Sequence, residues 1–128
     1  MIQKIEHIAV VVQDLERTIQ FYQDLFGFQL RIKGQNDVRE MAFIYLESKP
    51  EVEIELIRDL TPTTEYSADG IVNHIAFSVE NLDQVMKELQ EKGITFHSEK
   101  PKKAIDGARM IFFQGLNKEL LQLVERPR

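Results

Sequence analysis

The sequence contains the same short pattern twice. Residues 6–12 read EHIAVVV and residues 73–79 read NHIAFSV, which places His7 and His74 at an offset of 67, since 74 − 7 = 67. The same offset relates Glu55 to Gln122 near the far end of each copy, since 122 − 55 = 67. A shared offset at both ends of a segment indicates duplication of a unit of about 60 residues. The chain of 128 residues is therefore expected to fold as two similar halves.

Each half predicts the element order βαβββ. Apolar residues alternate as in a strand and then recur at helical spacing after a cap residue, which is Asp14 in the first half and Asn81 in the second. Gly27 and Gly93 are expected to end the helices, and the polar segment 59–70 to connect the halves. The predicted strands are about 4–12, 28–33, 40–47 and 52–58 in the first half, and about 71–79, 94–98, 108–114 and 119–125 in the second.

Alternation along the strands predicts which side chains face the helices and which face away. The core face is assigned to Ile8, Val10, Val12, Val52, Ile54 and Leu56, and in the second half to Ile75, Phe77, Val79, Leu121 and Leu123. The opposite face then holds His7, Glu55, His74 and Gln122 beside apolar residues such as Ala9. A carboxylate on a half-apolar face is costly unless a positive charge compensates it, and a divalent cation would do so.

Other polar and aromatic residues receive weaker assignments. Glu53 lies on the face of Glu55, about 7 Å away, and is expected to be a rim charge rather than a second base. His97 has no histidine partner at the repeat offset and is expected on the surface. Three arginines are candidates for binding an anionic substrate, namely Arg39, Arg58 and Arg109. Four aromatic residues are candidates for the core or a pocket wall, namely Phe43, Tyr45, Phe112 and Phe113.

Composition excludes several classes of function. The net charge of −5 argues against nucleic-acid binding. The absence of cysteine excludes a disulfide framework and a thiolate nucleophile or metal ligand. No apolar run approaches the roughly 20 residues of a membrane span, and the N-terminus lacks the pattern of a signal peptide. A cytoplasmic protein without nucleic-acid or membrane partners is therefore expected.

Two βαβββ halves, each opened by His-Ile-Ala and closed by Glu-Leu or Gln-Leu, resemble the vicinal oxygen chelate superfamily of glyoxalase I, bleomycin-resistance proteins and dioxygenases. The stretch DLERTIQFYQDLFGF, residues 14–28, is similar to the first helix of that family. The resemblance covers the whole chain. It implies one α+β domain over residues 1–128, with modules at about 1–60 and 71–128, curled mixed sheets and helices on the outer face. Exposed sheet edges and the family's habit of pairing modules across subunits suggest a homodimer.

The resemblance also implies a metal site. By position its ligands would be His7, Glu55, His74 and Gln122, a nitrogen and oxygen set that suits Zn, Ni, Co, Mn or Fe. Gln122 stands where relatives often carry a glutamate that resembles the catalytic base. An amide can ligate through its oxygen but cannot take a proton, so Glu55 becomes the candidate catalytic residue. The implied function is a glyoxalase I-like lyase or isomerase, which moves a proton on a small oxygen-chelating substrate.

Two alternatives stay open. One is a non-catalytic small-molecule binding or resistance protein of the same fold. The other, less favoured, is an extradiol-type dioxygenase using His7, His74 and Glu55, because the carboxylate of that class normally comes from the last strand. The thiol cosubstrate is also open. Relatives that use glutathione typically carry arginine four residues after the first ligand and often asparagine four after the second, where this chain has Val11 and Asp59.

Overall fold

The computed structural model describes residues 3, 5–61, 66, 69, 70, 72–104 and 106–127. The chain divides into two compact units, Met1–Tyr66 and Ser67–Arg128, each of which is described by itself. Residues 4 and 71, where the sequence predicts the first strand of each half to begin, lie outside the described residues.

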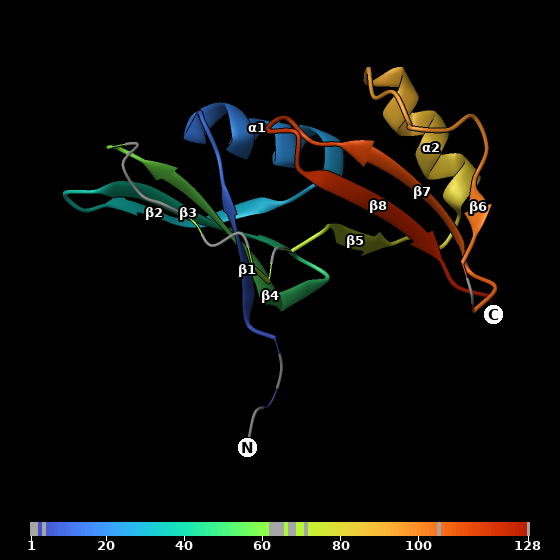
Figure 1. Ribbon diagram of the computed structural model, residues 1–128, viewed down its shortest axis with the longest axis horizontal. Helices are drawn as coiled ribbons and strands as arrows, with labels where there is room; N and C mark the ends of the chain where they lie inside the picture. Colours follow the sequence, from blue (N-terminus) through green and yellow to red (C-terminus); the bar gives the residue numbers. More distant parts are fainter. Residues whose placement is uncertain are drawn as a thin grey trace. The chain divides into compact units, whose positions relative to one another are not determined.

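The first unit follows the predicted order βαβββ (Figure 1). Its sheet has the strand order β1-β4-β3-β2, with β1 parallel to β4 and the other neighbours antiparallel. The elements are β1 (His7–Val11), α1 (Leu15–Phe26), β2 (Gln29–Gln35), β3 (Arg39–Leu46) and β4 (Lys49–Asp59). The central strand β4 therefore carries Glu55 between β1 and β3.

The second unit repeats this arrangement. Its sheet has the order β5-β8-β7-β6, again with a parallel pair, β5 and β8, followed by antiparallel neighbours. The elements are β5 (Ile75–Ser78), α2 (Leu82–Glu91), β6 (Lys102–Lys103), β7 (Arg109–Gln114) and β8 (Leu120–Glu125). Two mixed four-stranded sheets, each with one helix, confirm the predicted α+β class of two βαβββ modules.

The strand predicted at residues 94–98 is wrong. Within this range Phe96 makes only an isolated bridge with Phe113. The second strand of the βαβββ order is instead β6, which begins a few residues later. Phe96 is buried with its ring 5.4 Å from that of Phe113. Beyond it the Ser98 hydroxyl donates to the Lys100 carbonyl, and Pro101 has no N–H to give to a ladder. Because Phe96 is held against Phe113 and Pro101 cannot donate a hydrogen bond, continuous strand pairing begins only at residue 102.

Both helices begin at the predicted caps, and α1 ends at the predicted glycine, whereas the C-cap of α2 is Lys92, with Gly93 following it at φ 95°. The Asp14 carboxylate accepts from the backbone N–H of Arg17 at 3.0 Å, and Asn81 accepts in the same way from Gln84 at 3.1 Å. Gly27 ends α1 in the left-handed conformation, at φ 77°. Among the described residues, no helix has the length and apolar character needed to cross a membrane.

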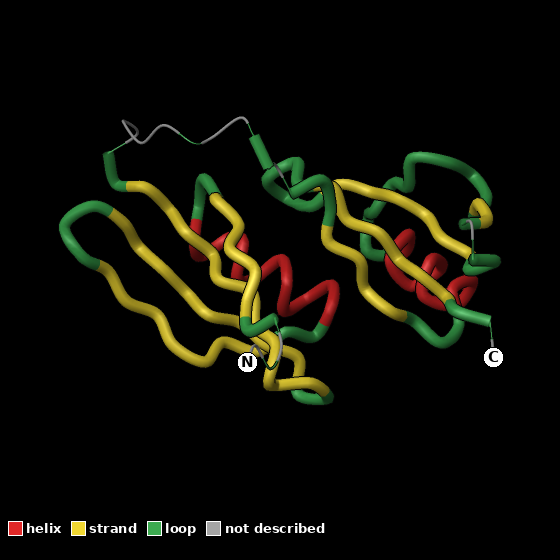
Figure 2. The backbone as a smooth tube through the Cα atoms, turned by 60° about the horizontal axis from the view of Figure 1, so that its bottom comes forward, coloured by secondary structure: helices red, strands yellow, loops and turns green. Residues whose placement is uncertain are grey.

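Each helix covers one face of its own sheet (Figure 2), since α1 contacts β3 and β4 and α2 contacts β8. Tyr22 of α1 is fully buried. The predicted core residues Ile54, Leu56, Leu121 and Leu123 are buried as well. The assignment of Val52 to the core is wrong, because its side chain is 43% exposed. The pairing of β1 with β4 begins one residue later, where His7 lies opposite Glu53, so Val52 extends beyond the paired region.

A charged network joins the end of β8 to the start of α2. The Glu125 carboxylate accepts from the backbone N–H of Leu82 at 2.7 Å, and the Arg109 guanidinium pairs with both Glu125 at 3.2 Å and Asp83 at 2.9 Å. The Leu82 hydrogen bond first, and Arg109 next, hold the pKa of Glu125 below its ordinary value, although desolvation opposes them. Arg109, a candidate for anion binding in the sequence, is thus engaged within the fold.

Candidate functional site

The four candidate ligands fall two in each unit. The first half-site is His7 on β1 with Glu55 on β4, and the second half-site is His74, directly before β5, with Gln122 on β8. Glu55 is in register with Ala9, as Gln122 is with the equivalent alanine of β5, so the two half-sites occupy matching places in their sheets. Among the described residues, no three histidine, aspartate or glutamate side chains gather into a metal site.

In the first half-site a histidine ring lies between two carboxylates. Nε2 of His7 is 3.6 Å from Oε1 of Glu55, and Nδ1 is 2.7 Å from Oε1 of Glu6. The first distance is too long for an N–H···O hydrogen bond. Two ligands of one tetrahedral ion, each about 2.1 Å from it, lie about 3.4 Å apart. The spacing of Nε2 and Oε1 therefore fits a pair of metal ligands. The Glu55 side chain is only 14% exposed.

An aromatic ring and an ion pair border the first half-site. Phe43 lies opposite Glu55 in the β3–β4 ladder and meets the His7 ring edge to face, with centroids 5.6 Å apart. The guanidinium of Arg31 lies 5.1 Å from the Phe43 centroid and binds both oxygens of Glu53, at 2.6 and 3.0 Å. The charge of Glu53 is therefore balanced by Arg31, although its side chain is only 12% exposed, which is less than expected for a charge at the rim.

The second half-site has the same layout with neutral partners. Nδ1 of His74 is 2.9 Å from Oδ1 of Asn73, and its ring meets Phe112 edge to face at 5.3 Å. Phe112 lies opposite Gln122 in the β7–β8 ladder. Gln122 is 7% exposed, and its amide nitrogen donates to the sulfur of Met110 at 2.8 Å. The amide oxygen is then the Gln122 atom that can ligate an ion.

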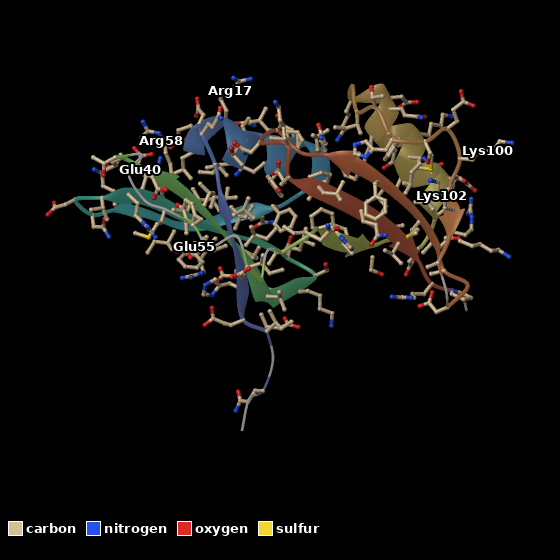
Figure 3. All side chains as sticks on the ribbon, in the orientation of Figure 1. Arg17, Glu40, Glu55, Arg58, Lys100 and Lys102 are labelled. Carbon is tan, nitrogen blue, oxygen red and sulfur yellow. The ribbon has the colours of Figure 1, made fainter. Side chains whose placement is uncertain are left out.

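A pocket of about 340 Å³ adjoins the second half-site. It shares Met110 and Phe112 with that half-site, and its lining is more apolar than polar. Its volume lies within the range of small-molecule sites, about 300–1,000 Å³. Lys102, labelled in Figure 3, adds a positive charge to the lining. The lining residues are His97, Ser98, Lys102, Met110, Ile111 and Phe112.

A second pocket, of about 450 Å³, lies where β1 and β4 end in the first unit. Val11 and Asp59, the two positions considered for the thiol cosubstrate in the sequence, both line it. Asp59 accepts from the Tyr66 hydroxyl, which raises the Tyr66 pKa, and pairs with Arg39 at 3.5 Å. The Asp59 carboxylate therefore lines this pocket with acidic charge that is shared with Tyr66 and Arg39. Its lining is Val11, Val12, Gln13, Arg58, Asp59, Leu60 and Tyr66.

The other arginine at this end of the sheet is also paired. Arg58 contacts Glu40 on the neighbouring strand β3 at 3.3 Å, and both lie apart from Glu55, farther back along β4 (Figure 3). Each of the three arginines considered as anion ligands therefore has an acidic partner within its own unit, with Arg39 paired to Asp59.

Sequence reasoning missed Glu6 and Asn73 altogether, and it named Phe43 and Phe112 only as core or pocket wall, without their contacts to the histidine rings. Glu6 and Asn73 stand at the repeat offset, since 73 − 6 = 67, so the duplication itself could have identified them. Phe43 and Phe112 are 69 residues apart, since 112 − 43 = 69, and the offset does not relate them. Their equivalence comes from strand register, in which each lies opposite the second candidate ligand of its unit.

Comparison with known proteins agrees with this architecture. The family model described as Glyoxalase/Bleomycin resistance protein/Dioxygenase superfamily matches residues 6–112. The uncharacterized protein YwbC of Bacillus subtilis is 30% identical over 98% of this chain and 100% of its own. Lactoylglutathione lyase of Salmonella typhimurium is 28% identical over 68% of this chain and 66% of its own. A crystal structure of a glyoxalase family protein from Enterococcus faecalis, 26% identical, covers 96% of this chain and 98% of its own with a TM-score of 0.78. A duplicated βαβββ fold and a family match across most of its length make this chain a member of the glyoxalase, bleomycin-resistance and dioxygenase superfamily.

Proposed function

We propose that the protein is a metal-dependent lyase or isomerase of the glyoxalase I type, acting by proton transfer on a small substrate with two neighbouring oxygens. The observation that carries the proposal is the 3.6 Å spacing of His7 Nε2 and Glu55 Oε1. That spacing is too long for a hydrogen bond and suits two ligands of one ion. The likeness to a lactoylglutathione lyase supports the same class of reaction.

The proposed ligands are His7 and Glu55 from the first unit with His74 and the amide oxygen of Gln122 from the second. A divalent ion bound there would supply Lewis acidity toward the substrate oxygens. Glu55 is the proposed base, because Gln122 cannot take a proton. Its carboxylate would remove a proton from the carbon beside one substrate oxygen and return it to the adjacent carbon, so the substrate is isomerised without net loss of a proton.

The neighbours of Glu55 suit a proton carrier. Ala9 and Phe43 flank it in the ladder, and the carboxylate is largely withdrawn from water. The nearest like charge on its strand face, Glu53, is held by Arg31 and is therefore not available as a competing base. Glu6 contacts the other nitrogen of the His7 ring, Nδ1, so Glu55 is the carboxylate proposed for the chemistry.

The test separates metal binding from proton transfer. After stripping and reloading with divalent metals, the wild-type protein should bind about one equivalent per chain, and a His7→Ala/His74→Ala variant should bind none. Glu55→Gln, which keeps an oxygen ligand, should retain most of the metal and lose turnover of thiohemiacetals. Solvent deuterium should appear in the product of the wild-type reaction. Retained turnover in Glu55→Gln would refute the assignment of the base.

A second candidate function is non-catalytic binding of a small molecule. It is favoured by Gln122, which is buried with its amide nitrogen on Met110 and beside a largely apolar pocket. This function predicts a protein that takes up no metal and changes no ligand. A dioxygenase would instead bind iron and consume oxygen with a catechol, and metal content with oxygen uptake distinguishes all three.

A homodimer is part of the proposal. Strand β2 is an edge strand and is exposed along its whole length, including Leu30 and Ile32 at 39% and 54%. An apolar edge strand is a template for pairing with another chain, and a second copy would cover it. Light scattering in solution tests this expectation, and a monomer at all concentrations would contradict it.

A further inference from the structure

The residue that precedes each candidate histidine contacts the same nitrogen of the ring. Oε1 of Glu6 lies 2.7 Å from Nδ1 of His7, and Oδ1 of Asn73 lies 2.9 Å from Nδ1 of His74. Neighbouring side chains in a regular strand point to opposite faces and do not meet in this way. Both contacts occur where a strand starts, at the first residue of β1 and directly before β5. The same local device is therefore built into both copies of the duplicated unit.

An aromatic ring fixes the plane of each imidazole from another side. The His7 and Phe43 rings lie at 87° with centroids 5.6 Å apart, and the His74 and Phe112 rings lie at 86° with centroids 5.3 Å apart. A hydrogen bond at Nδ1 and an edge-to-face contact together restrict rotation about both side-chain torsions. In the first unit this orientation turns Nε2 toward Oε1 of Glu55.

We propose that Glu6 and Asn73 are positioning residues, which hold the rings of His7 and His74 by Nδ1 and present Nε2 of each as the metal-binding atom. The inference rests on the proposed metal site. A neutral imidazole carries its hydrogen on one nitrogen and a lone pair on the other. An ionised carboxylate can only accept, so Glu6 keeps the hydrogen of His7 on Nδ1. The side-chain oxygen of Asn73 does the same for His74.

The two positioning residues are not equivalent. Glu6 offers a charged acceptor and Asn73 a neutral one, and charge-assisted hydrogen bonds are roughly twice as strong. Loss of such a partner typically weakens metal binding by about 10–100-fold. Glu6→Ala should fall toward the upper part of that range. Asn73→Ala should weaken metal binding by a factor in the lower part of the range. Glu6→Gln should do the same, because glutamine retains an acceptor oxygen.

The first experiment reads the rings without any metal. Long-range ¹⁵N–¹H spectra of protein labelled in histidine distinguish the two tautomers of a neutral imidazole from each other and from the imidazolium form. His7 and His74 should carry their hydrogen on Nδ1 in the wild type. Glu6→Ala should shift His7 away from that tautomer, while Glu6→Gln should restore it. A wild-type His7 with its hydrogen on Nε2, or one unaffected by Glu6→Ala, would overturn the inference.

The second experiment titrates Zn²⁺ into the wild type and the same variants. Glu51→Ala is the matched control, because it removes an exposed carboxylate from the same unit. The control should bind as the wild type does, and Glu6→Ala should bind more weakly by the stated factor. Equal weakening in the control would show a general charge effect and overturn the positioning role. If the wild type binds no Zn²⁺, the proposed function fails, and the tautomer spectra still decide the inference.

Discussion

Replacing Gln122 by glutamate tests whether this buried amide faces a metal. The change adds a carboxylate of nearly the same shape at a residue that is 7% exposed, and it removes the N–H that donates to Met110. Without metal, the new charge would be buried beside a thioether, which has no hydrogen to donate. With metal, the same charge would have a divalent cation to compensate it. Without metal, the Gln122→Glu variant should therefore be less stable than the wild type. Added metal should stabilise the variant more than it stabilises the wild type.

The size of the effect follows from burial and chain length. A buried polar group left without its partner costs about 1–3 kcal/mol, and a charge costs more. The unfolding entropy is about 2.1 cal/mol/K per residue, or about 0.27 kcal/mol/K for the 128 residues of this chain. The neutral-group cost alone corresponds to about 4–11 °C, so the metal-free melting temperature of Gln122→Glu should fall by at least about 4 °C. A ligand at 100 times its Kd stabilises the wild type by about 2.7 kcal/mol, and the variant should gain more than this.

Thermal unfolding with and without added Zn²⁺ measures both effects. Gln114→Glu is the control, since it makes the same chemical change at an exposed end of β7. The control should melt within a degree or two of the wild type and respond to metal equally. A metal-free Gln122→Glu protein as stable as the wild type would refute the burial argument. A metal-induced rise no larger than that of the wild type would refute the placement of residue 122 beside the ion.

Two further predictions concern the scaffold that holds the half-sites. Tyr22 is fully buried, with the rings of Phe26 and Phe28 at 5.4 and 5.6 Å, so Tyr22→Ala should cost about 3–5 kcal/mol by chemical denaturation, and a loss below about 1 kcal/mol would contradict the packing. The hydrogen bond from the backbone N–H of Leu82 is the main cause that lowers the pKa of Glu125. The ionised Glu125 carboxylate therefore stabilises the fold at pH values above its ordinary pKa of 4.5, and this stabilisation is lost as pH falls through the pKa of the folded state. The difference in melting temperature between wild type and Glu125→Gln should accordingly shrink on acidification from about pH 7 to about pH 3, and a difference independent of pH would exclude this linkage.

The offset of 67 residues predicted more of the candidate site than any other sequence feature. It related Glu55 to Gln122, and the register shows both on the central strand of a sheet, each beside an alanine of the parallel neighbour. Period-two alternation then assigned Leu56 and Leu123 to the core, where they are buried. These inferences succeed because duplication preserves strand order and because alternation follows directly from strand geometry.

Counting residues fails where a strand is irregular. Phe43 and Phe112 occupy equivalent places although they are 69 residues apart, and register shifts interrupt the pairing of β2 with β3 and of β3 with β4. A bulge adds a residue to one strand without changing which residues pair on either side of it. The sequence offset between equivalent residues then changes, although their places in the sheet do not. The partners of the arginines were equally hidden, because a contact such as Arg31 with Glu53 depends on which strands are neighbours.

The unequal pair of Glu55 and Gln122 has a consequence for the kind of molecule the site would prefer. Two imidazoles and an amide are neutral, so one carboxylate would offset only half the charge of a divalent ion, where two carboxylates would offset all of it. The positive charge of the ion that is not offset would act in surroundings of low polarity, where electrostatic interactions are stronger than in water. Selection among substrates would then favour molecules that arrive as, or become, monoanions, and neutral chelators would compete poorly. In the proposed site, an amide at position 122 would therefore alter the electrostatic preference for substrates as well as the set of metal ligands.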